Sequence, residues 1–290
     1  PAGLLRGNMF RRAMTERDMD RMVTLFVTAA ERCYDAGFDA VEIHMGHGYL
    51  LNQFLSPLDN QRADAYGGSA ENRARFPARV LKAVKEALGD RIAVLAKINV
   101  ADGRSKGAQL EDGVITAKIL EQAGADMLVL SGGRNVESGW FTFGSNMNLE
   151  AMLRVLGKWS LSGMAIASTQ AAVPKIEFKE LYFWEYSTKI REAVDLPLAY
   201  LGGVKSADNV AQCMDAGFEA VQLAGPFFGS PIWSIDGLGE AGNRSGITAK
   251  VAWATFYIRP GSGGSIGPAK FSETTKDWAP PGSSASQTRR

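Results

Sequence analysis

The sequence predicts an α/β fold in which parallel strands alternate with helices. A phrase recurs at 35–43, 122–130 and 215–223, and in each copy a helix-like end and a glycine precede an apolar run. This pattern is typical of a helix that ends at a glycine and leads into a buried strand. Two further apolar runs, at 92–99 and 197–202, fall between the copies. Five strands that alternate with helical stretches indicate βα units and a parallel sheet.

The helices are predicted from their capping residues and from the intervals between strands. Thr15 is followed three residues later by Asp18, a capping pattern that begins a helix running to Ala36. Ser69 can cap a second helix that runs to Leu88. Further helices are predicted near 110–123, 175–194 and 206–216.

A TIM (β/α)8 barrel is favoured over a doubly wound sheet. The Gly-x-Gly-x-x-Gly fingerprint that a dinucleotide fold carries after its first strand is absent, and the glycines of 261–267 have another spacing and follow no strand. A closed barrel needs eight strands and typically about 250 residues. We therefore expect an incomplete barrel domain over 1–235. Glycine, serine and proline dominate further on, which predicts an irregular, poorly ordered tail over 236–290.

Composition excludes several function classes. Of the 290 residues 46% are hydrophobic, but no long uncharged run could cross a membrane. The 32 basic residues nearly balance the 31 acidic ones, and no basic block predicts a nucleic-acid partner. The two cysteines have no partner spacing, and the beginning of the chain lacks the apolar core of a signal peptide, so a cytoplasmic protein is expected. The chain does not begin with methionine, which suggests upstream sequence. The oligomeric state is not predicted, and a homo-oligomer is possible.

The two histidines, His44 and His47, are the best candidates for chemistry. They lie in the segment 41–50, where an apolar run breaks into glycines and Tyr49. Imidazole and phenol groups commonly polarise and protonate a carbonyl. Positions three apart on a strand face opposite ways, so the two rings converge only if the backbone bends, which Gly46 and Gly48 permit. The alternative is a hydrogen-bonded structural histidine. A catalytic metal is not predicted, because zinc needs about three protein ligands.

The region 134–174 is longer than an ordinary βα loop and contains Trp140, Phe141, Phe143 and Trp159. Such a loop either covers the active face as a lid or forms a small satellite core of its own. The sequence leaves both alternatives open.

The runs Gly37–Leu58 and Asn60–Phe76 closely resemble the Old Yellow Enzyme family of FMN-dependent NAD(P)H:flavin oxidoreductases, and the resemblance extends to about Leu223. It implies a flavin at the mouth of a barrel, reduced by NAD(P)H, that passes a hydride to a small-molecule acceptor such as an activated alkene. His44 and His47 match the pair that binds the acceptor's carbonyl oxygen. Tyr49 matches the proton donor. The strands present would be about the fourth to the eighth.

The resemblance also implies the residues that hold FMN. Lys97 falls where the family carries a cation that faces the flavin ring, although the usual residue is arginine. Gly202 and Gly203 match glycines that let backbone amides approach the phosphate, and Ala224 and Gly225 follow the last strand, where the family's phosphate-binding arginine is replaced by Pro226. As alternatives, Lys97 could be an inward residue paired with a carboxylate, and the glycines could be ordinary turn residues.

Three functions therefore remain open. The first is an FMN-dependent oxidoreductase, and the second is a non-catalytic remnant of that family that holds no flavin. The third is a flavin-free barrel lyase or isomerase that uses the same histidines and Tyr49.

Overall fold

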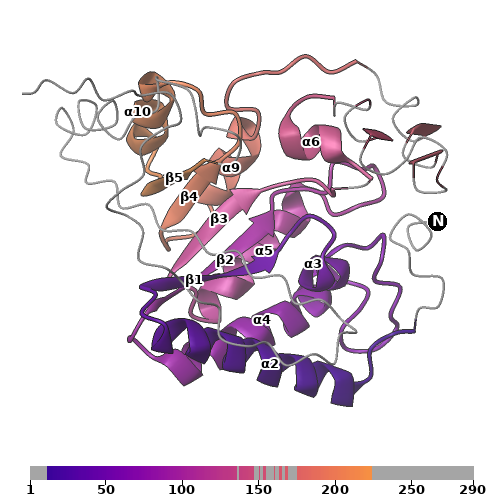
Figure 1. Cartoon of the computed structure of the whole chain (residues 1–290), viewed down its shortest axis with the longest axis vertical. Helices are drawn as coiled ribbons and strands as arrows, with labels where there is room; N and C mark the ends of the chain where they lie inside the picture. Colours follow the sequence, from indigo (N-terminus) through magenta and orange to yellow (C-terminus); the bar gives the residue numbers. More distant parts are fainter. Residues whose placement is uncertain are drawn as a thin grey trace, which may run out of the picture. The chain divides into compact units, whose positions relative to one another are not determined.

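Five parallel strands form one sheet. The computed structural model describes residues 12–135, 137–146 and 175–223, together with 150, 153–154, 160, 163–164 and 167–168. The strands are β1 (Ala40–Met45), β2 (Ala93–Asn99), β3 (Met127–Ser131), β4 (Leu198–Leu201) and β5 (Ala220–Gln222). Their order in the sheet is their order in the chain (Figure 1). Sequential pairing is the topology of a (β/α)8 barrel, whereas a doubly wound sheet reverses its order at a switch point.

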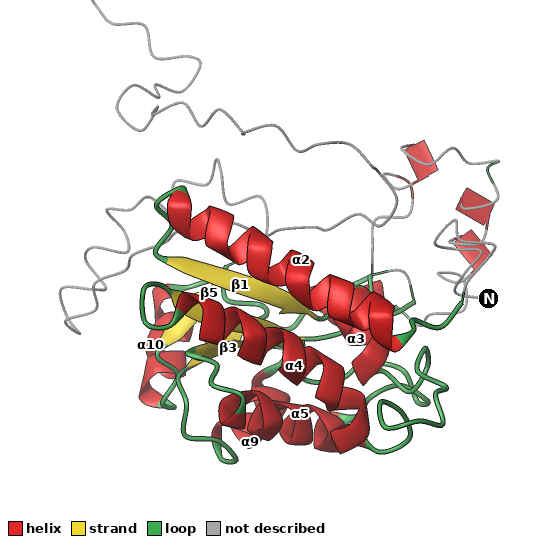
Figure 2. Ribbon diagram, turned by 90° about the horizontal axis from the view of Figure 1, so that it is seen from below, coloured by secondary structure: helices red, strands yellow, loops and turns green. Residues whose placement is uncertain are grey.

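The long helices cover one face of this sheet. They are α2 (Glu16–Asp35), α4 (Ala70–Leu88), α5 (Leu110–Gln122), α9 (Trp184–Arg191) and α10 (Ala207–Asp215). Helices α2, α4, α5 and α9 lie side by side across that face (Figure 2). Thr15 begins α2 with the predicted capping box, and the Ser69 hydroxyl accepts the Asn72 N–H at the start of α4.

The two faces of the sheet differ in chemistry. On β1, Val41, Ile43 and Met45 are buried in the main hydrophobic core beneath the helices. The alternate positions face the inside of the curved sheet, where β3 and β4 supply a second apolar cluster of Val129, Ala199 and Leu201. Polar side chains occupy the same inner face, since Lys97 and Asn99 alternate with outward residues along β2. This inner face leads to the candidate site.

One predicted helix is much shorter than expected. The interval 175–194 contains helix only in α9, and 175–179 carries no regular structure. Leu181 adopts the left-handed conformation with φ of 50°, and its N–H donates to the Gly203 carbonyl at 3.1 Å. Tertiary contact with the end of β4 therefore holds this segment out of the helix. Conversely, the short helices α3 (Leu50–Leu55) and α6 (Gly139–Phe143) were not predicted.

The described aromatic side chains of the loop after β3 differ in burial. Phe141 packs against Phe183 and Tyr186, with ring centroids 5.2 Å and 5.5 Å away, and so joins the main hydrophobic core rather than a satellite core of its own. Phe143 is 52% exposed. Trp159 and the predicted tail over 236–290 lie outside the described residues. Within the part of the chain that the structure describes, no helix has both the length and the apolar character needed to cross a bilayer.

Candidate functional site

The loops that follow β1 and β3 meet at the carboxyl edge of the sheet. His47 forms an isolated parallel bridge with Arg134, and the Asn135 N–H donates to the His47 carbonyl at 3.3 Å. The two loops therefore come together across the end of β2, which lies between their strands. In barrel enzymes this edge is the one that carries the active site.

The structure brings together the three side chains predicted to be catalytic. The ring centroids of His44 and His47 are 4.9 Å apart, and those of His44 and Tyr49 are 5.2 Å apart. Backbone turns make this convergence possible, because His47 and Gly48 both have left-handed φ angles, of 59° and 80°. The bend was predicted at Gly46 and Gly48, but its first left-handed residue is His47 itself.

Gly46 serves a different purpose from the predicted one. A Cβ atom at this position would lie 2.7 Å from the Asn99 Oδ1 atom, well inside contact distance. Gly46 is therefore needed for the close approach of Asn99 to the turn. We call residues 46–49 the histidine turn.

Both imidazoles are held in the neutral form. Burial, with a smaller contribution from the positive charge of Lys97, lowers the pKa of His44 to about 4. Burial, followed by the charges of His44 and Lys97, lowers the pKa of His47 to about 3. Neutral imidazole carries one N–H donor and one acceptor nitrogen. At neutral pH the pair can therefore offer hydrogen bonds to an acceptor without carrying charge.

Two residues that the sequence did not single out contact the predicted groups. The His47 Nε2 atom lies 2.7 Å from the Ser131 hydroxyl at the end of β3. The Asn135 side-chain amide donates to the Tyr49 hydroxyl at 3.0 Å. Both residues stand at or just after the carboxyl end of a strand, and that placement is the signal that could have found them.

Lys97 lies beside His44 on the neighbouring strand, as their register shows. Its ammonium group is 2.8 Å from the Glu42 carboxylate, and both side chains are largely buried. Gln222 on β5 donates to the same carboxylate at 2.9 Å. The structure thus contains the carboxylate partner that the alternative interpretation of Lys97 required.

The predicted phosphate-binding glycines are packed against protein. Cβ atoms built on Gly202 and Gly203 would lie 2.7 Å from the Phe183 ring and 2.8 Å from the Tyr182 ring, respectively. Both glycines have positive φ angles, of 131° and 74°. We call residues 202–204 the glycine turn. The side-chain space of its glycines is filled by the segment before α9. Ala224 and Gly225 lie outside the described residues.

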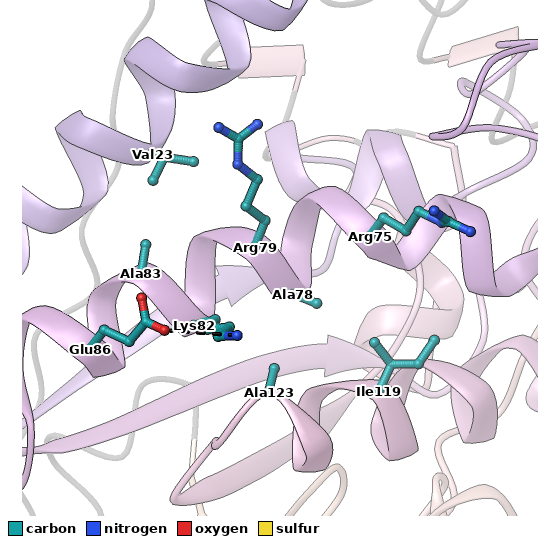
Figure 3. Close-up of a pocket in the computed structure, with 9 residues that line it drawn as sticks. All are labelled: Val23, Arg75, Ala78, Arg79, Lys82, Ala83, Glu86, Ile119 and Ala123. Carbon is teal, nitrogen blue, oxygen red and sulfur yellow. Dashed lines mark ion pairs between the residues drawn. The ribbon is translucent and has the colours of Figure 1, made fainter.

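A separate groove of about 500 Å³ lies on the helical side of the sheet, between α2, α4 and α5 (Figure 3). Its floor is apolar, with Val23, Ala78 and Ile119 among its lining residues. Arg79 pairs with Asp20, and Lys82 lies 3.8 Å from Glu86 in an exposed ion pair. These charges are typical of a solvated helix surface. We assign the groove no chemistry.

Comparison with known proteins supports one family. Residues 4–139 match the model of the NADH:flavin oxidoreductase / NADH oxidase family. The 4,4'-dithiodibutanoate disulfide reductase of Rhodococcus erythropolis is 37% identical over 211 residues, which cover 72% of this chain and 52% of that protein. Over these residues the chain is similar to this family. The predicted resemblance to the Old Yellow Enzymes is therefore confirmed.

Further relatives agree with the family and the fold. The NADPH dehydrogenase of Bacillus licheniformis is 44% identical over 120 residues, which cover 41% of this chain and 35% of that protein. The structure of the Old Yellow Enzyme homologue from Zymomonas mobilis has a TM-score of 0.54 at 22% identity and covers 83% of this chain and 56% of that one. This likeness confirms the barrel-type α/β fold. The chain spans about half the length of the Rhodococcus family member and about a third of the Bacillus one.

Proposed function

We propose that this chain carries the acceptor-binding half of an FMN-dependent oxidoreductase that uses NAD(P)H as its hydride donor. The observation that carries the proposal is the meeting of His44, His47 and Tyr49 at the carboxyl edge of the sheet in a chain similar to this family. When bound, FMN would supply the transfer of a hydride from NAD(P)H to a small-molecule electron acceptor. The remaining roles belong to side chains of this chain.

The residues at the histidine turn fit the ring of a flavin and its acceptor. The two neutral imidazoles and the Tyr49 hydroxyl form a compact set of donors. Lys97 adds a fixed positive charge on the same inner face. Such a cation suits an anionic flavin ring, and uncharged donors suit a carbonyl oxygen that gains charge during the reaction.

In this proposal His44 and His47 bind the carbonyl oxygen of the acceptor. Hydrogen-bond donors aimed at a developing oxyanion lower the barrier by roughly 3 to 4 kcal/mol each in well-studied hydrolases. For His47 to donate from Nδ1, its Nε2 atom must accept the proton of the Ser131 hydroxyl, which is 2.7 Å away. Ser131 would then set the tautomer of His47.

Tyr49 would supply the proton that completes the reduction of an alkene. It is 37% exposed, so its hydroxyl can reach an acceptor from solvent. A phenol hydroxyl is one of the side-chain groups that serve as general acids. The Asn135 amide donates to the phenol oxygen, which orients the phenolic proton away from Asn135.

The glycine turn, where the FMN phosphate is expected to bind, supports a second candidate function. This is a family member that holds no flavin. The Cβ side of Gly202 and Gly203 is filled by Phe183 and Tyr182, so the missing side chains leave no open cradle there. Phosphate binding would have to use backbone N–H groups of the glycine turn. The flavin-free lyase or isomerase remains a third reading, but the family match favours redox chemistry.

One experiment separates the candidates. The purified chain is incubated with FMN, freed of unbound flavin by gel filtration, and examined for a visible flavin spectrum that NAD(P)H bleaches. A bound, reducible flavin supports the oxidoreductase. A folded but colourless protein, as judged by circular dichroism, would favour the flavin-free remnant, and turnover of a lyase or isomerase substrate without flavin would favour the third reading.

The acceptor can be sought among two chemical classes. Activated alkenes suit the carbonyl-binding histidines and the Tyr49 proton donor. The name of the Rhodococcus relative indicates a disulfide, 4,4'-dithiodibutanoate. The rate of NADH or NADPH oxidation is therefore measured with 2-cyclohexenone and with that disulfide. The combination of donor and acceptor with the highest rate identifies the preferred nucleotide and the acceptor class.

A further inference from the structure

We propose that Asn99 is a positioning residue of the site, which fixes the main chain of the histidine turn so that the His47 ring stays beside His44. Asn99 does not touch the rings' reacting edges in this scheme; it acts through the backbone of His47. The proposal rests on the proposed function of the histidines, but the contacts that carry it are independent of flavin.

The side chain of Asn99 joins three segments of the chain. It stands at the end of β2, is 6% exposed, and accepts the His47 backbone N–H through Oδ1 at 3.1 Å. Its Nδ2 group donates to the Asp102 carboxylate at 3.0 Å and to the Gly133 carbonyl at 2.8 Å. Since both of these partners are acceptors, the amide has only one orientation that satisfies all three contacts, with Oδ1 toward His47.

Asp102 holds Asn99 in this orientation. The carboxylate is fully buried and also accepts the Ser56 hydroxyl at 2.5 Å and the Ala108 N–H at 2.9 Å. A buried carboxylate must have its acceptor sites satisfied, and breaking such a network is costly. The network therefore restrains Asn99 from the side that faces away from the histidines.

The conformation of His47 needs this restraint. A non-glycine residue in the left-handed region is strained relative to ordinary backbone. The φ angle of His47 is 59°, and its ring is partly buried next to His44 and Lys97, which also lowers its pKa to about 3. The hydrogen bond from its N–H to Asn99 offsets the backbone cost. Gly46 provides the space for that bond, as its missing Cβ shows.

The test uses the fact that the chain contains only two histidines. Protein with labelled histidine gives two imidazole signals by NMR, which His44→Gln and His47→Gln assign. We compare the wild type, Asn99→Ala and Ser56→Ala across pH, all without flavin, and measure urea unfolding of each. Ser56→Ala is the matched control, because it removes a bond from the same network without touching the contact between Asn99 and His47.

We expect the wild-type His47 signal to stay in its neutral form down to about pH 5, whereas in Asn99→Ala it titrates at least about one pH unit higher, toward the ordinary value near 6.5. In Ser56→Ala the unfolding free energy falls while the His47 titration stays that of the wild type. An unchanged His47 titration in Asn99→Ala, or an equal shift in Ser56→Ala, would overturn the proposal. If Asn99→Ala does not fold, Asn99→Ser replaces it, because its hydroxyl is too short to reach the His47 N–H and the same shift is expected.

This readout is separate from the proposed function. If the wild-type chain binds no FMN but Asn99→Ala shifts the His47 titration, the positioning role of Asn99 stands and the oxidoreductase assignment fails. A chain that binds and reduces FMN without the shift would retain the oxidoreductase and lose the role of Asn99.

Discussion

The histidine turn after β1 and the glycine turn after β4 lie at the same edge of one sheet, yet they are built by opposite means. Polar contacts hold the histidine turn, through Asn99 and Ser131. Close apolar packing holds the glycine turn, against Tyr182 and Phe183. The first arrangement keeps hydrogen-bonding side chains in place for chemistry, whereas the second removes side chains so that protein segments can approach.

The difference teaches what each turn can tolerate. A polar network fails when one partner leaves, because the remaining buried groups keep their desolvation cost. A close-packed turn fails when any atom is added. The two turns should therefore respond to different substitutions, and four experiments test this contrast.

The largest effect is expected on turnover at the histidine turn. If FMN binds, the double variant His44→Ala/His47→Ala should lower kcat/KM for an enone by about ten-thousandfold, because each lost donor costs at least roughly a hundredfold. Steady-state oxidation of NAD(P)H measures this. Lys82→Gln, in the groove on the helical side, is the control and should leave kcat/KM unchanged. Equal turnover in the double variant and the wild type would remove the histidines from the mechanism.

The next effect concerns the buried arginine of the loop that meets the histidine turn. Arg134 is 1% exposed, and its guanidinium lies 2.5 Å from Asp59 and 3.3 Å from Glu137. Arg134→Met should lower the unfolding free energy by about 3 to 5 kcal/mol, since it removes the buried cation from a cluster of largely buried carboxylates. Arg79→Met, which breaks a partly exposed pair with Asp20, should cost less than about 1 kcal/mol. Urea denaturation measures both, and equal losses would contradict the contrast between buried and exposed pairs.

The glycine turn is tested with a matched pair of glycines. Gly37 has a φ angle of 86° with nothing near its absent Cβ, whereas Gly203 has a φ of 74° and a Cβ position 2.8 Å from the Leu181 nitrogen. Gly37→Ala should cost about 1 kcal/mol from backbone strain alone. Gly203→Ala should cost roughly 2 kcal/mol more, because it adds overpacking. Thermal or urea unfolding gives the difference in unfolding free energy between the two variants. Equal losses would mean that the segment before α9 moves to accommodate the added Cβ atom.

The smallest effect is a pH dependence of stability that comes from His44 and His47. The pKa values of His44 and His47, about 4 and about 3, lie below the ordinary 6.5 of the unfolded chain. The unfolded state therefore binds more protons below pH 6.5, and stability is lost as pH falls from there toward the folded pKa values. Each histidine contributes up to about 1.4 kcal/mol per pH unit.

This loss can be assigned by subtraction. In His44→Gln, the drop in unfolding free energy between about pH 5.5 and 4.5 should be smaller by up to about 1.4 kcal/mol. In Gly203→Ala the drop should equal that of the wild type, because the glycine turn contains no titrating group. A His44→Gln protein with an unaltered pH dependence would mean that the His44 imidazole is not held neutral by burial.

Much of the fold could be predicted because its signals are local. The threefold repeat of helix end, glycine and apolar run places β1, β3 and β5, and Thr15 and Ser69 mark the helices that they cap. These signals depend on residues within a few positions of one another. The helix predicted over 175–194 was too long, because contact between Leu181 and Gly203 overrides the local preference.

The sequence by itself determined the alternation of strands and helices, the family resemblance, and the clustering of His44, His47 and Tyr49 in one segment. Only the tertiary structure decided how these groups are held, because the partners of the site come from distant segments: Ser131 is 84 residues from His47, and Asn135 is 86 residues from Tyr49. Parallel strands bring their carboxyl ends to one edge whatever their separation in the chain. The side chains that meet there depend on register, which local patterns do not encode.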